Sequence, residues 1–197
     1  MSNNLGFGNG LLVIVSSPSG GGKTSVIHEV RRRNSKYGYS ISATTRPRRE
    51  SEIDGSDYYF ITDKQFDEHI EKKSFVECAN VHGFRYGTLK ETIEKQLNDD
   101  KIVLLDIDVI GGMNVKKQFP DNSFLIFLYP PSKQELVQRL EKRNSDSKED
   151  IERRIGRLPM EMSHVDKYDV KIINYKFDET VQLVEQEIKK YQSKLEV

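Results

Sequence analysis

Short, almost wholly apolar runs alternate along this chain with longer charged segments in which apolar residues recur at helical spacing. A strand that helices cover on both faces meets no water, so near-continuous apolar runs are typical of parallel strands in an α/β fold. The predicted strands are 11–16, 102–106, 124–129 and 170–174, with a fifth candidate at 40–44. The predicted helices are 23–33, 89–97, 132–142, 179–195 and the stretch after Ser147. The order of these elements predicts an α/β domain with a largely parallel sheet.

Two of the predicted helices begin with a capping box, in which a Ser side chain and an acidic residue three positions later bind each other's backbone N–H groups. The pairs are Ser132 with Glu135, and Ser147 with Asp150. They place a helix boundary near residues 144–147.

The middle of the chain differs from this pattern. Residues 58–61, 75–81 and 84–86 are short pieces rich in Tyr, Phe and Val, which predict a small sheet inserted into the α/β core. We therefore expect residues 40–90 to form a substrate subdomain.

The charged stretch 139–157 has two interpretations, a mobile lid or a solvated helical hairpin, and its composition alone favours the hairpin. Gly156 and Pro159 lie in the helix predicted after Ser147. Because an interior Pro removes one helical hydrogen bond and clashes with the preceding turn, we expect a kink or an early helix end there.

Composition excludes some classes of function. The 197 residues include 31 Lys and Arg and 31 Asp and Glu, so the net charge of +0 argues against binding nucleic acid or an anionic membrane through bulk charge. The apolar run 11–15 is too short to span a bilayer. A single cysteine, Cys78, rules out an internal disulfide, and we expect a protein of the reducing cytoplasm.

A glycine-rich segment follows the first predicted strand and precedes a predicted helix. We call it the phosphate loop; its residues are Ser17, Pro18, Ser19, Gly20, Gly21, Gly22, Lys23 and Thr24. Glycines let backbone N–H groups approach a polyphosphate, and the helix N-terminus attracts the same anion. Lys23 would neutralise the β and γ oxygens of a nucleoside triphosphate, and the Thr24 hydroxyl would bind Mg²⁺. The alternative is a glycine-rich turn that binds no ligand. Ser17 stands where the general phosphate-loop motif has its first Gly.

A basic segment begins with the candidate strand 40–44 and continues past it. Arg46, Arg48 and Arg49 fall within four positions, and residues 40–49 contain no acidic side chain. Guanidinium groups bind phosphate oxygens bidentately, which suits a phosphate monoester. An exposed basic turn explains the segment equally well when it is taken alone.

Several motifs then occur in an order that resembles the guanylate kinases over residues 11–174. They are Ser-Pro-Ser-Gly-Gly-Gly-Lys-Thr, Ser-x-Thr-Thr-Arg-x-x-Arg, Gly-x-x-Tyr, Phe-Val-Glu, Tyr-Gly-Thr, Leu-Asp-Ile-Asp and Arg-Leu-x-x-Arg. The resemblance implies that Mg²⁺-dependent transfer of the γ-phosphoryl group of ATP to GMP gives ADP and GDP, with dGMP as a possible acceptor.

The resemblance also implies roles for individual residues. The GMP phosphate would be held by Arg46, Arg49, Tyr58 and Tyr86, and the guanine by Ser42, Glu77, Thr88 and Asp108. The chemistry agrees, because a carboxylate accepts hydrogen bonds from guanine N1–H and N2–H, whereas adenine would leave a buried carboxylate unpaired. Without the resemblance, Glu77 would be read as an outward-facing residue on an edge strand.

Asp106 ends the predicted strand 102–106, where a phosphate-loop enzyme places a carboxylate near Mg²⁺ and its waters. The alternative is an Asp that only caps the next turn. By similarity, Arg139, Arg143 and Arg154 would cover the transferring phosphoryl group together with Lys23 and Arg46, and Asn174 would lie near the adenine of ATP. No general base is required, since positioning and electrostatics perform the catalysis.

The implied architecture is a phosphate-loop nucleotide kinase with three parts. The core would comprise residues 10–39, 90–132 and 168–197, with a GMP-binding subdomain at 40–89 and a helical lid at 133–167. The sequence departs from the family pattern at Ile110 (usually Gln), Asn144 (usually Gly) and Tyr175 (usually acidic or amide).

Two other functions fit part of the pattern. Guanylate kinase-like domains also serve as catalytically silent protein-binding modules, but such a module has no need of Lys23, Thr24 or the lid arginines. A GTPase would explain the D-x-x-G spacing from Asp108 to Gly111, yet no N-K-x-D motif occurs. Both a monomer and a homodimer are compatible with the sequence.

Overall fold

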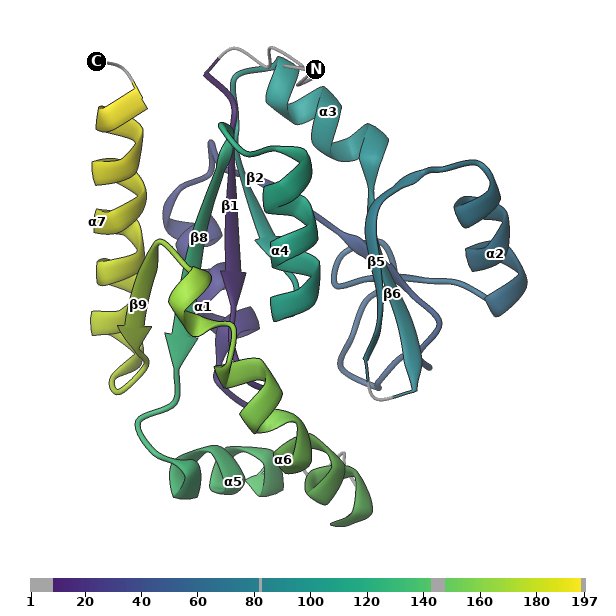
Figure 1. Ribbon diagram of the computed structural model, residues 1–197, viewed down its shortest axis with the longest axis vertical. Coiled ribbons are helices and arrows are strands. Elements are labelled where there is room, and N and C mark those ends of the chain that lie inside the picture. Colours follow the sequence, from purple (N-terminus) through teal and green to yellow (C-terminus); the bar gives the residue numbers. More distant parts are fainter. Residues whose placement is uncertain (1–8, 82, 143–147, 196–197) are drawn as a thin grey trace.

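The computed structural model describes residues 9–81, 83–142 and 148–195. Its core is a five-stranded sheet of order β2-β7-β1-β8-β9, in which all neighbouring strands are parallel (Figure 1). The strands are β1 (Leu11–Ser16), β2 (Gly38–Ser40), β7 (Ile102–Asp106), β8 (Ser123–Tyr129) and β9 (Val170–Ile173). This sheet confirms the predicted α/β fold class.

Helices cover the core sheet on both faces. Alternate β1 residues face opposite ways, and Val13 packs with α1 (Lys23–Arg33) and α7 (Phe177–Leu195). Ile14 packs on the other face with α3 (Lys90–Asn98) and α4 (Val109–Gln118). Every residue of β1 and β7 is buried, which explains why these strands read as continuous apolar runs.

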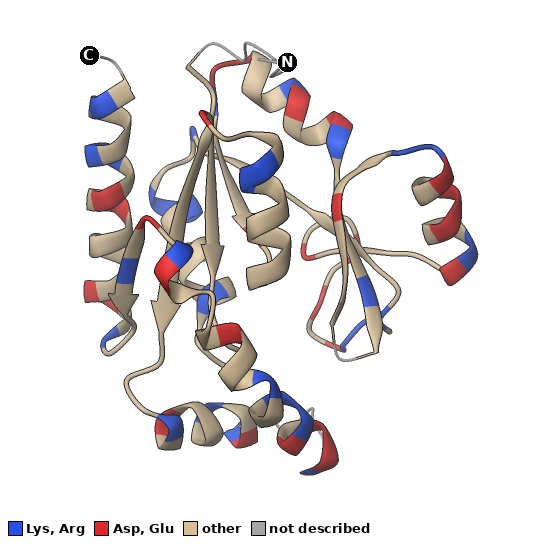
Figure 2. Cartoon of the chain, viewed as in Figure 1, with Lys and Arg blue, Asp and Glu red and all other residues tan. Residues whose placement is uncertain are grey.

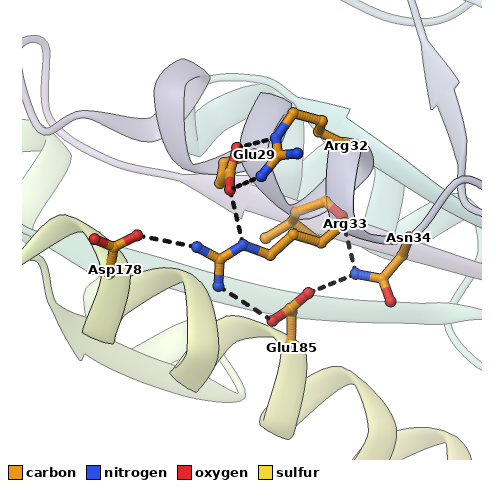
Figure 3. A network of polar contacts seen from close by, with 7 residues as sticks. Glu29, Arg32, Arg33, Asn34, Asp178 and Glu185 are labelled. Atoms are coloured by element: carbon orange, nitrogen blue, oxygen red, sulfur yellow. Dashed lines mark hydrogen bonds and ion pairs between the residues drawn. The ribbon is translucent and has the colours of Figure 1, made fainter.

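A polar network joins α1 to α7, the two helices that cover the same face of the core sheet (Figure 3). Arg33 donates to Glu29 on its own helix and to Asp178 on α7, and Asn34 donates to Glu185 at 2.6 Å. The C-terminal end of α1 is therefore joined to the first half of α7.

A second sheet of order β4-β3-β6-β5 lies beside the core (Figure 1). Its elements are β3 (Ser42–Thr44), β4 (Tyr59–Phe60), β5 (Phe75–Val81) and β6 (Phe84–Leu89), with α2 (Asp63–Glu71) between β4 and β5. The prediction of one strand at 40–44 was wrong, because the chain crosses from the core sheet to the second sheet at Ile41. Ser40 pairs with β7, whereas Ser42 pairs with β6.

Two helices below the core sheet carry charges of both signs, whereas the core strands carry few (Figure 2). They are α5 (Lys133–Lys142) and α6 (Lys148–Met162), and the short helix η1 (Val165–Lys167) follows. The Glu135 N–H donates to the Ser132 hydroxyl at 3.0 Å, as expected for a helix cap. Ser147 lies outside the described residues.

Of the kink or early helix end expected near Pro159, the early end was wrong, since α6 continues to Met162 with the proline inside it. Met160 and Met162, which follow the proline, pack against the apolar cluster beneath the sheet. This packing holds the last turn of α6 in place although Pro159 donates no backbone hydrogen bond.

Two helices were not predicted. Helix α2 begins with a capping box formed by Thr62 and Gln65, a signal present in the sequence. Helix α4 begins at Asp108 and contains Gly111 and Gly112, which are poor helix formers, so its sequence signal is weak. In the described part of the chain, no helix combines the length and apolarity needed to cross a bilayer.

Candidate active site

The carboxyl ends of β1 and β7 open into a cavity of about 450 Å³ between the phosphate loop, the second sheet and α6. Most of the predicted site residues line it: all eight residues of the phosphate loop, Ser42, Arg46, Arg49, Tyr58, Glu77, Tyr86, Asp106, Asp108 and Arg154. The cavity therefore brings the phosphate loop together with basic and acidic side chains from distant parts of the chain.

The phosphate loop connects the end of β1 to the start of α1. Gly20 and Gly22 both have φ of 87°, a left-handed conformation that other residues rarely adopt. The Ser17 side chain fits because it packs against Gly21, where an added Cβ would lie only 2.8 Å from the Ser17 Cβ. The Ser17 hydroxyl donates a hydrogen bond to the Pro18 carbonyl. The departure from the general pattern at position 17 is thus compensated by Gly21.

Lys23 points from the start of α1 to the end of β7. Its Nζ lies 2.6 Å from Asp106 Oδ1 and donates to the Ile107 carbonyl at 2.9 Å. The second oxygen of Asp106, Oδ2, is buried and finds no hydrogen-bond partner among the residues that the structure describes. A carboxylate oxygen of this kind, with Thr24 lining the same cavity, fits Mg²⁺, which prefers oxygen ligands and retains several waters.

Arg46 lies at the opposite side of the cavity. Its guanidinium donates to Tyr86 Oη at 3.2 Å and to Glu52 Oε1 at 2.7 Å, and lies 5.5 Å from the centre of the Tyr58 ring. The backbone N–H of Arg49 donates to the other Glu52 oxygen. Arg46 therefore contacts both tyrosines, and Glu52 links it to Arg49.

Sequence reasoning missed Glu52. It follows the acid-free segment 40–49 by only three positions, and this spacing from Arg49 is a signal that could have identified an internal partner for the arginines.

The predicted guanine-binding residues form a row across three strands. Ser42 on β3 pairs with Thr88 on β6, which in turn pairs with Glu77 on β5. All three are buried, and the Thr88 hydroxyl donates to Glu77 Oε1 at 2.6 Å. Burial, with the charge of Asp108, raises the pKa of Glu77 to about 7, although the Thr88 hydrogen bond opposes the shift.

Asp108 reaches the same region from the core. Its Oδ1 caps α4 by accepting from the Gly111 N–H at 2.8 Å. Gly111 is needed there, because a Cβ at this position would lie 2.7 Å from Glu77 Oε2. The two carboxylates are thus close on either side of the first turn of α4.

Helix α6 contacts the phosphate loop directly, since Arg154 donates to the Ser19 hydroxyl at 2.7 Å. Glu161 on the same helix is 4% exposed, and burial raises its pKa against the opposing charge of Arg157. Neither Glu161 nor Arg157 was singled out from the sequence, because a pair four residues apart is common on any helix and the other partners of Arg157, Asp108 and Asn80, are distant along the chain. Arg143 and Asn144 lie outside the described residues.

Asn174 binds the backbone of the phosphate loop, and Arg139 binds the backbone of Asn174. Buried Asn174 donates to the Gly21 carbonyl at 2.7 Å, and Arg139 donates to the Asn174 carbonyl at 3.1 Å. Arg139 also pairs with Glu135 on α5. Of the departures from the family pattern, Tyr175 is 72% exposed and Ile110 is 39% exposed in the first turn of α4.

Comparison with known proteins agrees with this geometry. Residues 9–191 match the family model for guanylate kinase. A guanylate kinase of Thermotoga maritima is 40% identical over 175 residues, covering 89% of this chain and 84% of the relative. One of Fusobacterium nucleatum is 45% identical over 170 residues, covering 86% of this chain and 91% of the relative.

A solved structure gives the same result. The crystal structure of guanylate kinase from Anaplasma phagocytophilum superimposes with a TM-score of 0.77 at 26% identity, covering 93% of this chain and 86% of that one. Because motifs, fold and relatives agree over nearly the whole length, the chain belongs to the guanylate kinase family.

Proposed function

We propose that this guanylate kinase transfers the γ-phosphoryl group of ATP to GMP within the 450 Å³ cavity, giving ADP and GDP. The observation that carries the proposal is that one cavity is lined both by the phosphate loop and by the residues suited to a guanine nucleotide. ATP binds with its phosphates on Ser17, Pro18, Ser19, Gly20, Gly21, Gly22, Lys23 and Thr24.

Arg46, Arg49, Tyr58 and Tyr86 bind the phosphate of GMP. Two fixed guanidinium groups and two phenols provide donors on one side of the cavity, and Glu52 already orients Arg46 and the backbone of Arg49. An incoming phosphate meets donors that are already directed to an anion.

Glu77 and Asp108 accept hydrogen bonds from guanine N1–H and N2–H, and Ser42 and Thr88 complete the subsite. AMP offers an acceptor at N1 and lacks the 2-amino group, so it leaves these carboxylates without donors. None of the assigned contacts involves the ribose 2′-hydroxyl, so we expect dGMP to serve as a second acceptor.

Mg²⁺ would be held by the Thr24 hydroxyl and, through water, by Asp106. The buried, unpartnered Oδ2 of Asp106 supports this assignment. Bound there with ATP, the ion would neutralise charge on the β- and γ-phosphates. Lys23, now 2.6 Å from Asp106, lies within reach of the same phosphates.

Catalysis then consists of alignment and charge stabilisation. Lys23, Arg46 and Arg154 line the cavity between the two proposed phosphate sites, and the family resemblance assigns Arg139 and Arg143 to the same task. A GMP phosphate oxygen attacks the γ-phosphorus without a general base, and ADP leaves. Asn174 contributes beside the ATP site by holding the Gly21 carbonyl, close to where the family places adenine.

The molecule divides into a core (10–39, 90–132 and 168–197), a GMP-binding subdomain (40–89) and a lid (133–167). Closure of the lid would exclude water and suppress hydrolysis of ATP. All the assigned groups come from one chain, and both a monomer and a homodimer are compatible with this arrangement. ATP and GMP are metabolites of the cytoplasm, where the exposed thiol of Cys78 would stay reduced.

A matched pair of arginine substitutions tests the assignment. Arg46→Lys keeps the charge but loses the planar fork, and we expect the KM for GMP to rise by about tenfold or more while the KM for ATP changes less than about twofold. Arg32→Lys, at an exposed position on α1 that is not among the residues lining the cavity, is the control and should leave both constants near those of the unmodified protein. Equal effects of the two substitutions would refute the assignment.

A further inference from the structure

Arg157 lies on α6 three residues after Arg154, so both side chains leave the helix on the same side. Its side chain is only 22% exposed. It extends toward groups from two other parts of the molecule, namely the second sheet and the start of α4. The resemblance to guanylate kinases assigned it no role.

The guanidinium of Arg157 faces three acceptors. Nη2 lies 3.5 Å from Asp108 Oδ2, Nη1 donates to the Asn80 carbonyl on β5 at 3.5 Å, and Nε lies 3.8 Å from Glu161 Oε1. Because Asp108 Oδ1 is used to cap α4, Oδ2 is the oxygen left for guanine. Arg157 therefore lies against the one oxygen on which the base would depend.

We propose that Arg157 is a positioning residue that links the lid helix α6 to the guanine-binding carboxylate of Asp108. The inference rests on the proposed role of Asp108 in guanine recognition. Arg157 holds the carboxylate in the orientation in which Oδ2 faces the cavity and can accept from guanine N–H groups. An oxygen with two lone pairs can accept from both partners.

The same helix thereby contacts both substrate sites. Arg154 reaches Ser19 on the phosphate loop and Arg157, one turn later, reaches Asp108. Since a helical turn is rigid, α6 cannot leave the guanine site without also changing its contact with the phosphate loop. Arg157 couples recognition of the acceptor base to the position of the lid over ATP.

A double-mutant cycle tests this coupling, with Arg157→Ala, Asp108→Asn and the combined variant measured by steady-state kinetics. Asn retains the capping oxygen of α4 and removes the charge. We expect Arg157→Ala to raise the KM for GMP about three- to tenfold, with less than about twofold change in the KM for ATP. The combined variant should be no more than about twofold worse than Asp108→Asn alone.

Two further variants separate positioning from general structural damage. Arg157→Lys should recover part of the affinity for GMP, because a Lys retains the charge without the fork. Lys148→Ala removes an exposed cation from the start of the same helix and should change neither constant. Without GMP, Arg157→Ala should also hydrolyse ATP at a different rate from the unmodified protein, whereas Lys148→Ala should not.

The outcomes distinguish this inference from the function on which it rests. If Asp108→Asn leaves the KM for GMP unchanged, the guanine-binding role of Asp108 fails, and the link fails with it. If Asp108→Asn impairs GMP binding but the two substitutions multiply independently, only the role of Arg157 is overturned. Equal rises of the KM for GMP and for ATP in Arg157→Ala would likewise contradict it.

Discussion

Among single residues, Glu77 has the most unusual environment. It is 7% exposed, accepts a hydrogen bond from Thr88 and lies near the charge of Asp108. Burial raises its pKa to about 7, so the group changes its charge within the working range of most enzymes.

This pKa predicts how GMP binding depends on pH. Only the ionised carboxylate accepts from both guanine donors, and the ionised fraction grows as pH rises through about 7. We therefore expect the KM for GMP to fall between pH 6 and pH 8, with a much smaller change in the KM for ATP. Steady-state kinetics across this range measures both constants, and Glu77→Gln should abolish the pH dependence while weakening GMP binding. A KM for GMP that rises with pH would contradict this role.

Ionisation of Glu77 favours GMP binding but destabilises the folded protein. In the unfolded chain Glu77 ionises near pH 4.5, whereas in the folded chain it ionises near pH 7. Between these values the unfolded state binds fewer protons, so stability falls as pH rises, by at most roughly 3 kcal/mol for a shift of this size.

Glu77→Gln removes this loss because the amide does not ionise. The variant should gain stability relative to the unmodified protein as pH rises from 4 to 8, and urea denaturation at several pH values measures the difference. A difference that stays constant with pH would show that the carboxyl titrates normally in the folded state.

At the level of elements, the buried strands of the core sheet were the most predictable part of the fold. Strands β1 and β7 begin and end at the predicted residues, because burial on both faces leaves an uninterrupted apolar run. The crossing at Ile41 was not predictable, since residues 40–44 have strand character on both sides of a change of sheet. Helix α4 was missed because its first turns contain Gly111 and Gly112, which are poor helix formers. Both must be small, since Gly111 packs against Glu77 and Gly112 against Tyr168.

Helix α6 offers a test of how tertiary contacts override helix propensity. Gly156 is exposed in its interior, and a Cβ there would meet no atom within 4 Å. Gly156→Ala should therefore stabilise the protein by about 0.5–1 kcal/mol, since Ala loses less backbone entropy than Gly on forming a helix.

Urea denaturation of Gly156→Ala measures this gain. Gly111→Ala is the contrasting variant, because its Cβ would collide with the Glu77 carboxylate, and it should lose stability. If Gly156→Ala is destabilising instead, the packing of α6 described above is wrong.

In the whole molecule, the site is assembled from parts that are local and parts that are not. The phosphate loop could be located from sequence because its function resides in eight consecutive residues. The pairing of Asn174 with Gly21 and of Arg157 with Asp108 could not, because each depends on how elements distant along the chain pack. The motifs identified the chemistry, and the fold brings its parts into one cavity.

The central claim is that this cavity phosphorylates GMP. The most direct measurement is ADP formation from ATP and Mg²⁺ with GMP, AMP, CMP or UMP as separate acceptors, using the unmodified protein, Lys23→Ala and the exposed-lysine control Lys36→Ala. We predict rapid ADP formation with GMP alone, loss of that activity in Lys23→Ala and its retention in Lys36→Ala. A folded protein that forms no ADP with GMP, or that accepts AMP equally well, would contradict the account.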